Sequence, residues 1–231
     1  MFLALSQNRS LSKTWSIPAV LLGLGFAALY ASQITAISHA FDGVGQEVTN
    51  AGLHLLIYIF MVSTIVLLKY TGRRQFAIFT MMACVVFASI REGSELIMYL
   101  SGFVSSVMLG SAIGAGIGVS LGVFFYYSIA SMRLNLGLLF GLILLVFIAG
   151  GMVSQAVQLL TQADFISSQS AIWNSTFLVD EQSLIGQLLY ALIGYESTPT
   201  LVQFIAYSLS LVVGAVLAMR TFLSSMVSET P

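Results

Sequence analysis

The chain has 231 residues, of which 58% are hydrophobic and only 7% are charged, and its formal net charge at pH 7 is −1. A soluble domain carries about 25% charged residues, so this composition excludes an ordinary water-soluble protein. It also excludes a basic nucleic-acid-binding surface. The single cysteine, Cys84, excludes an internal disulfide and a CxxC metal or redox motif. Apolar runs long enough to cross a bilayer recur along the chain, and they predict an all-α polytopic membrane protein.

One transmembrane domain over residues 1–231, with six spanning helices, is predicted. The spans cover about residues 17–38, 48–68, 76–102, 107–131, 135–160 and 200–220. Arg9 and Lys13 before the first span resemble the start of a signal peptide. Its apolar stretch reaches about 20 residues, which is longer than a usual signal-peptide core, so we expect a retained helix.

The basic residues orient the predicted bundle. Those that flank the spans all fall on one side if the N-terminus is cytoplasmic; they are Arg9, Lys13, Lys69, Arg73, Arg74, Arg133 and Arg220. The opposite loops carry acidic residues and no Lys or Arg; the acidic residues are Asp42, Glu47, Asp164, Asp180, Glu181 and Glu196. Both termini are therefore predicted to lie in the cytoplasm.

The second span begins outside with the sequence "FDGVGQEVTNAGLHLL". Glu47, Asn50 and His54 are spaced so that they share one helix face. Together with Asp42, they indicate an acidic external mouth that leads inward. The alternative is that Asp42 and Glu47 are a helix cap and a loop charge, and that His54 makes an ordinary hydrogen-bonded helix contact.

The third span places three charged residues in an apolar run, "FASIREGSELIMYL". On a helix, Arg91 and Glu95 share one face, and Glu92 lies about 60° around from Glu95. One arginine cannot neutralise two carboxylates, so the excess negative charge must meet a cation, a proton or water. Gly93 would let a neighbouring backbone or a hydrated ion approach. The alternative is a structural ion pair; an oxygen-only site favours a hard cation but leaves iron, manganese, magnesium and protons open.

The remaining elements suggest supporting roles. The fourth span has glycines at every fourth position, which favours close helix packing and would hold the charged third span against its partner; they are Gly110, Gly114, Gly118 and Gly122. Gln155 and Gln158 in the fifth span could supply amide oxygens, although polar helix–helix bonding is the default. Residues 183–195, in the external loop 161–199, predict a short amphipathic helix at the interface. HExxH and P-loop patterns are absent from the sequence, and no enzyme is predicted.

These residues resemble a known family, the high-affinity iron permeases or oxidase-dependent iron transporters. The segment from Arg91 to Glu95 resembles the family's REGLE motif, and "GVGQE" (43–47) resembles its Gly-x-x-Gln-Glu helix opening. The glycine-repeat helix follows the motif helix, as it does in the family. Residues 173–209 are similar to the family's closing signature, so the likeness covers nearly the whole chain.

The resemblance implies a seven-helix permease of a cell membrane, the bacterial inner membrane in this case, that moves iron inward. Glu92 and Glu95 would bind the metal, Glu47 would be a further metal ligand near the mouth, and Arg91 would balance or position the carboxylates. The residues that would support the site or form the mouth are Gly93, Ser94, His54, Asp42, Asp180 and Glu181. Iron would be the transported substrate, with no permanently bound cofactor. An extracytoplasmic iron oxidase or iron-binding protein would be the partner.

Three departures from the family pattern matter. Ser94 replaces the usual leucine and adds a hydroxyl beside the carboxylates, and Asn174 stands where the family often has aspartate. The family carries two REG-x-E helices, and this sequence contains one, so the six spans match the family's second to seventh helices. Residues 1–15 read like the end of the lost helix and the following cytoplasmic loop.

The missing motif leaves several possibilities open. The gene start could be assigned too far downstream, the chain could oligomerise, or a partner could supply the second REG-x-E helix. The chain could also be a non-transporting subunit of an iron-uptake complex. A permease for another metal cation, such as lead or manganese, is a further alternative.

Overall fold

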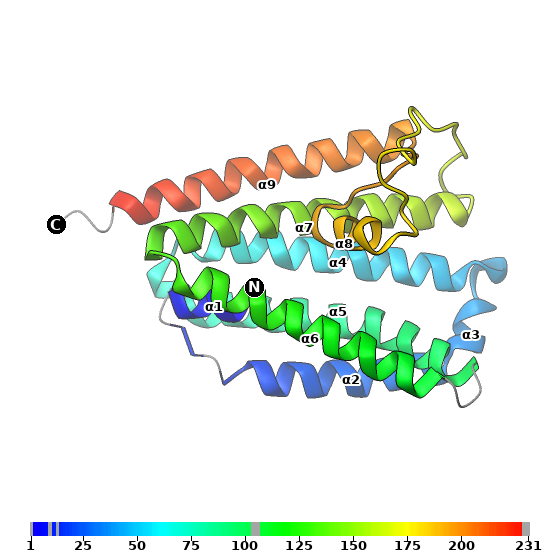
Figure 1. Cartoon of the computed structure of the whole chain (residues 1–231), viewed down its shortest axis with the longest axis horizontal. Coiled ribbons are helices and arrows are strands. Elements are labelled where there is room, and N and C mark those ends of the chain that lie inside the picture. The colour runs from blue at the N-terminus through cyan, green and yellow to red at the C-terminus, as the bar shows by residue number, and fades with distance from the viewer. Residues whose placement is uncertain (1, 9–10, 13, 103–106, 228–231) are drawn as a thin grey trace.

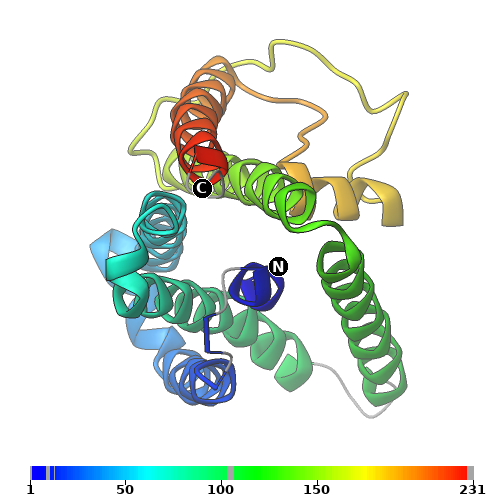
Figure 2. The same ribbon diagram turned by 90° about the vertical axis from the view of Figure 1, so that its left-hand side faces the viewer.

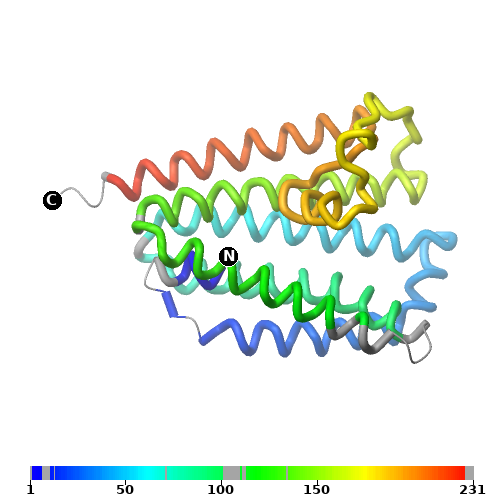
Figure 3. The backbone as a smooth tube through the Cα atoms, in the orientation of Figure 1, coloured from blue at the N-terminus to red at the C-terminus, as the bar shows by residue number. Residues whose placement is uncertain are grey.

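The computed structural model describes residues 2–8, 11–12, 14–102 and 107–227. The described chain has no β-strand, and its elements are helices, with a long segment between α7 and α9 that contains the short helix α8 (Figures 1 and 3). The helices are α1 (Phe2–Asn8), α2 (Ser16–Ser32), α3 (Ile34–Ser38), η1 (Phe41–Gly43), α4 (Gly45–Leu67), η2 (Thr71–Arg73), α5 (Arg74–Gly102), α6 (Val107–Ser131), α7 (Leu134–Gln162), α8 (Leu184–Ile193) and α9 (Leu201–Val227). The predicted all-α class is confirmed.

Five helices in the described chain are long and apolar enough to cross a membrane, namely α4, α5, α6, α7 and α9. They coincide with the second to sixth predicted spans. The first predicted span differs, because the helix over 17–38 is interrupted at Gln33 and divides into α2 and α3. The hydroxyl of Ser32 donates to the carbonyl of Leu29 over 2.7 Å, and such local side-chain bonds compete with the helical ladder.

The long helices form a row in which each packs against its neighbours. α5 lies between α2 and α4, and α7 lies between α4 and α9 (Figures 1 and 2). The buried core is centred on α4, α5 and α7, where Ile57, Ile65, Met81 and Leu145 are almost completely shielded. Burial of such side chains, together with close packing, holds the row together.

The short helix α1 contributes to this core although it is only 7 residues long. Its Ala4, Leu5 and Ser6 are fully buried, and it contacts α6 and α7 (Figure 2). Close approach to α7 depends on Gly141, because a Cβ added there would lie 2.7 Å from Leu5 Cδ2. A side chain at this position would therefore require the Leu5 side chain to move.

The glycine face of α6 does not have the predicted partner. A Cβ added at Gly110, Gly114, Gly118 or Gly122 would meet nothing within 4 Å. In the part of the chain that the structure describes, these glycines therefore do not pack α6 against the charged helix α5. Local spacing identifies a face that permits close packing but does not say what packs on it.

The long connection between α7 and α9 contains the predicted short helix, α8. Ser183 caps its N-terminus, with its hydroxyl accepting from the Gly186 backbone N–H over 3.0 Å. Gly194 ends it in the left-handed conformation, at φ 66°, which glycine adopts without strain. Exposed Leu184 and Ile185 are suited to the membrane interface.

Candidate metal-ion site

The charged motif lies on α5, within a membrane-spanning segment. Arg91 contacts both carboxylates, with Nη1 lying 2.5 Å from Glu92 Oε1 and Nη2 lying 3.2 Å from Glu95 Oε1. Sequence spacing predicts the second contact; the first arises because the long arginine side chain can also reach its immediate neighbour. One guanidinium thus serves two carboxylates and leaves one excess negative charge.

The three side chains differ in how far the described chain covers them. The Arg91 side chain is 18% exposed, that of Glu95 is 28% exposed and that of Glu92 is 65% exposed. Arg91 Nε is also buried without a hydrogen-bond partner among the described residues. The Glu92 carboxylate is therefore the most accessible part of the motif for a cation.

Gly93 and Ser94 have structural contacts that sequence reasoning did not identify. A Cβ on Gly93 would lie 3.0 Å from Ala27 Cβ, so this glycine lets α5 approach α2 rather than giving an ion access. Ser94 is fully buried, and its hydroxyl donates to the Arg91 carbonyl over 2.9 Å. That hydroxyl is therefore satisfied within the helix and does not face the carboxylates.

On α4, the structure separates the roles of Glu47 and His54. His54 is completely buried, with Nδ1 2.8 Å from the Asn50 carbonyl and Nε2 2.7 Å from Gln155 Oε1. Both ring nitrogens are thus occupied, which supports the alternative of an ordinary helix contact. Glu47 Oε2, in contrast, is buried without a hydrogen-bond partner in the described chain, so it retains the capacity to bind a ligand.

Tyr30 of α2 interacts with both the Glu47 carboxylate and the charged motif of α5. Its hydroxyl donates to Asn50 Oδ1 over 3.0 Å. The phenol also interacts electrostatically with both Glu95 and Glu47, so it lies in the field of both carboxylates. Sequence alone does not distinguish Tyr30, because a single tyrosine in an apolar run has no spacing pattern that marks a functional residue.

Tyr190 of α8 makes a comparable connection between the motif and the segment that links α7 to α9. Burial and the charge of Glu196 raise the pKa of Tyr190 to about 12, and Glu181, Arg91 and Glu92 also act on it. The charges of Glu196 and Glu181, as well as those of the Arg91–Glu92 motif, therefore all act on the Tyr190 phenol. From sequence, Tyr190 is an interfacial aromatic residue; only the folded position of α8 relates it to Arg91.

Two of the predicted mouth residues occupy turns. Asp42 lies in η1 with φ 60°, and Asp180 is exposed, with Oδ1 accepting from the Gln182 backbone N–H over 2.9 Å. Glu181 instead accepts from the Ser197 backbone N–H. The structure thus gives Asp180 and Glu181 hydrogen bonds that organise the segment between α7 and α9.

The described residues do not form a complete metal cage. They contain no group of three or more His, Cys, Asp or Glu side chains placed to hold a metal ion. Hard cations such as iron and magnesium are usually bound by several oxygen ligands. A hard cation held by Glu92 and Glu95 would therefore need additional ligands, from water or another helix.

Comparison with known proteins identifies a family and several relatives of the chain. Residues 61–231 match the model of the iron permease FTR1 family. The chain is 26% identical over 143 residues to the ferrous iron permease EfeU of Yersinia pestis, covering 59% of this chain and 51% of that protein. It is 26% identical over 134 residues to EfeU of Shigella flexneri serotype 5b, covering 55% and 57% of the two chains.

The chain spans about half the length of the curated relatives it matches. No solved structure matches it. The family match, the bacterial relatives and the five apolar helices identify a multi-pass membrane protein of the bacterial inner membrane. The predicted membrane class and localisation are thereby confirmed.

Proposed function

The chain belongs to the iron permease FTR1 family, and from that premise we propose that it takes part in iron transport across the membrane. Glu92 and Glu95 would bind the iron ion during its passage, and Glu47 would provide a carboxylate nearer the external side. The observation that carries this proposal is the excess negative charge of the Arg91–Glu92–Glu95 group inside a membrane span. Ionisable groups at such depth are costly and mark ion pathways.

We further propose that the site is completed by a second helix. Glu92 is 65% exposed within a spanning segment, and an ionised carboxylate that faces hydrocarbon is strongly unfavourable. A helix from a second copy, or from a partner with its own carboxylates, would cover Glu92 and supply further ligands. An extracytoplasmic iron oxidase or iron-binding protein would deliver the ion.

Iron uptake by cells tests the transport proposal. The chain is expressed in a transport-deficient bacterial host, and accumulation of radiolabelled iron is measured. We expect Glu92→Gln and Glu95→Gln each to reduce uptake at least about tenfold, which corresponds to about 1.4 kcal/mol of lost interaction with the ion. Asp164→Asn is the matched control, because Asp164 is exposed and has no assigned role at the site or the mouth, and asparagine tolerates its left-handed φ of 59°.

The outcomes separate the alternatives. Unchanged uptake in both glutamine variants would contradict the assignment of the ligands. A chain that reaches the membrane but gives no uptake by itself, and gives uptake only with a partner, is the subunit of a larger complex. The incomplete ligand set in the described chain favours this second candidate over transport by a single copy. Competition by manganese or lead ions measures the selectivity.

A further inference from the structure

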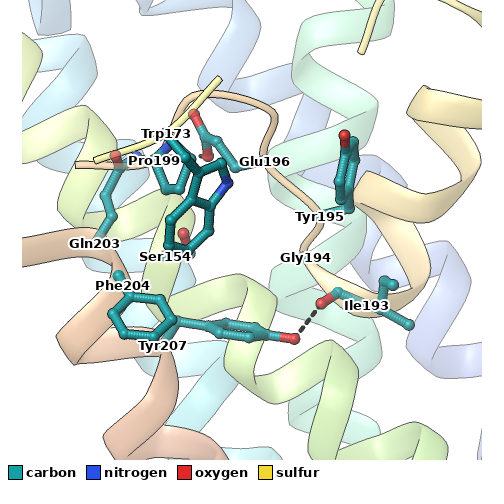
Figure 4. A pocket seen from close by; sticks show the side chains of 10 residues that line it. All are labelled: Ser154, Trp173, Ile193, Gly194, Tyr195, Glu196, Pro199, Gln203, Phe204 and Tyr207. Carbon is teal, nitrogen blue, oxygen red and sulfur yellow. Dashed lines mark hydrogen bonds between the residues drawn. The ribbon is translucent and has the colours of Figure 1, made fainter. Parts of the chain in front are cut away.

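A cavity of about 210 Å³ lies between α9 and the segment that links α7 to α9. Its walls are largely aromatic, since Trp173 comes from the linking segment and Phe204 and Tyr207 come from successive turns of α9. Figure 4 shows the Trp173 and Glu196 side chains together above the rings of Phe204 and Tyr207. Of the described residues that line the cavity, Glu196 alone has a side chain that ionises to a charge near neutral pH.

The aromatic rings of the cavity are held in place by their neighbours. The Tyr207 hydroxyl donates to a backbone carbonyl of α8. A Cβ on either Gly150 or Gly194 would lie 3.1 Å from Tyr207 Cε2, so the Tyr207 ring packs against two glycines. The Trp173 and Phe204 rings meet edge to face, with centroids 5.3 Å apart. Both are 43% exposed, so the cavity is open to a ligand.

The Glu196 carboxylate has hydrogen-bond donors but no basic partner. Its Oε1 accepts from Gln158 Nε2 of α7 over 3.0 Å, and its Oε2 accepts from Gln203 Nε2 of α9 over a longer 3.5 Å. These neutral amides favour the ionised carboxylate without cancelling its charge. The ion pairs of the described chain all involve Arg91 and the motif of α5. A carboxylate offers about four acceptor positions, so each oxygen can accept a further bond.

An aromatic wall beside a single carboxylate suits an organic ammonium group better than a metal ion. The faces of aromatic rings attract cations, and they recognise alkylated ammonium groups in particular. Hard metal ions instead need several oxygen ligands, whereas the described lining supplies one carboxylate. A cavity of about 150 Å³ can take up a molecule the size of benzene, so this cavity has room for a group the size of tetramethylammonium.

We propose that the cavity between Trp173, Glu196 and Tyr207 binds a small alkylammonium group, which contacts the ring faces and whose charge the carboxylate balances. The group belongs either to a soluble amine or to the headgroup of a membrane lipid. These two sources share the same chemistry, and the experiment below separates them. The inference depends on the lining of the cavity and does not require that the protein transports iron.

Equilibrium binding of radiolabelled choline to the purified full chain tests the proposal. The chain is placed in nanodiscs of equal parts phosphatidylglycerol and a neutral glycolipid, neither of which carries an ammonium group. Burial and the charge of Glu181 raise the pKa of Glu196 to about 7, so binding is measured at about pH 8, where most of this carboxyl is ionised. We expect saturable binding that tetramethylammonium displaces and that an equal concentration of potassium does not.

Substitutions locate the binding in the cavity. Glu196→Gln removes the charge and should weaken binding about tenfold or more. Trp173→Leu should weaken it about two- to fivefold, whereas Trp173→Phe should retain most of it, because phenylalanine keeps an aromatic face. Asp164→Asn and Phe177→Leu are the matched controls. Both change exposed residues of the same segment that do not line the cavity, so both should bind choline as the parent does.

A second set of nanodiscs separates the two sources of the ammonium group. Phosphatidylethanolamine replaces the glycolipid, which adds an ammonium headgroup and leaves the net surface charge unchanged. If a lipid headgroup occupies the cavity, choline binding should be about tenfold or more weaker in these discs. Equal binding in the two sets identifies a soluble amine as the ligand.

Three results would overturn the proposal. The first is the absence of saturable binding below about 10 mM choline in the glycolipid discs. The second is binding that Glu196→Gln leaves unchanged. The third is displacement of choline by manganese ions at lower concentration than by tetramethylammonium, which would identify a metal site. If Glu196→Gln does not fold, the Trp173 variants decide, and equal binding by Trp173→Leu and Trp173→Phe contradicts the aromatic contact.

Discussion

At the scale of single residues, the site contains polar groups with two different duties. Arg91, Glu92 and Glu95 carry charge that the described chain does not neutralise. His54 and Gln155 instead satisfy each other in a fully buried pair between α4 and α7. Because a buried polar group is costly when its partner is removed, the second pair stabilises the bundle whether or not an ion passes.

We expect His54→Leu to lower the free energy of unfolding by about 1 kcal/mol or more, because Gln155 is left without its partner. Replacing both residues with leucine should recover most of this loss, since no unsatisfied group remains. Thermal unfolding of the purified variants completes this double-mutant cycle. If the double variant is stable but has lost iron binding, His54 is a ligand and the structural role is wrong.

A second prediction at this scale concerns pH and stability. The pKa of Glu196 is raised to about 7, so the folded protein retains a proton that the unfolded chain releases near its ordinary pKa of about 4.3. The contribution of Glu196 to stability should therefore fall as pH rises from about 4.5 to about 7, and stay constant above that. Melting temperatures across this range should decline less in Glu196→Gln than in the parent; an equal decline would contradict the assignment.

At the scale of elements, glycine determines how closely the start of α8 packs against the residues that precede it in the chain. A Cβ on Gly186 of α8 would lie 2.1 Å from the Asp180 carbonyl oxygen and 2.7 Å from Glu181 Cα. Both neighbours are backbone atoms, which cannot rotate away as a side chain can. The start of α8 therefore depends on glycine at this position.

We expect Gly186→Ala to destabilise the protein by about 1–3 kcal/mol, the usual effect of overpacking. Gly52→Ala in α4 is the matched control, because nothing lies within 4 Å of a Cβ there and alanine favours a helix by about 0.5–1 kcal/mol. Thermal unfolding should thus move in opposite directions in the two variants. A Gly186→Ala protein as stable as its parent would show that α8 has another way to begin.

At the scale of the whole molecule, two surfaces lack a partner in the described chain. The glycine face of α6 meets nothing within 4 Å, and the Glu92 side chain is 65% exposed within a span. Glycines at four-residue spacing allow two helices to approach closely. A second copy, or a partner helix, that packs near these surfaces could also supply groups that neutralise the excess charge of the motif.

Self-association through α6 is therefore expected. Replacing Gly114 and Gly118 together with leucine should block close approach and reduce the dimer fraction about tenfold or more, equivalent to about 1.4 kcal/mol. Native mass spectrometry in detergent measures this fraction. Val119→Leu, on an exposed position of the same helix, should have no effect. A parent protein that is monomeric throughout would leave this surface to a different partner.

The sequence by itself determined the class of the protein, five of the spans, the short helix α8 and the charged motif. These features depend on local properties: the length of an apolar run, the spacing of charges and the residues that cap a helix. The tertiary structure alone decided that His54 meets Gln155, that the α6 glycines remain open and that Glu196 joins α7 to α9. Such pairings link residues far apart in the chain, and only the packing of whole helices brings them together.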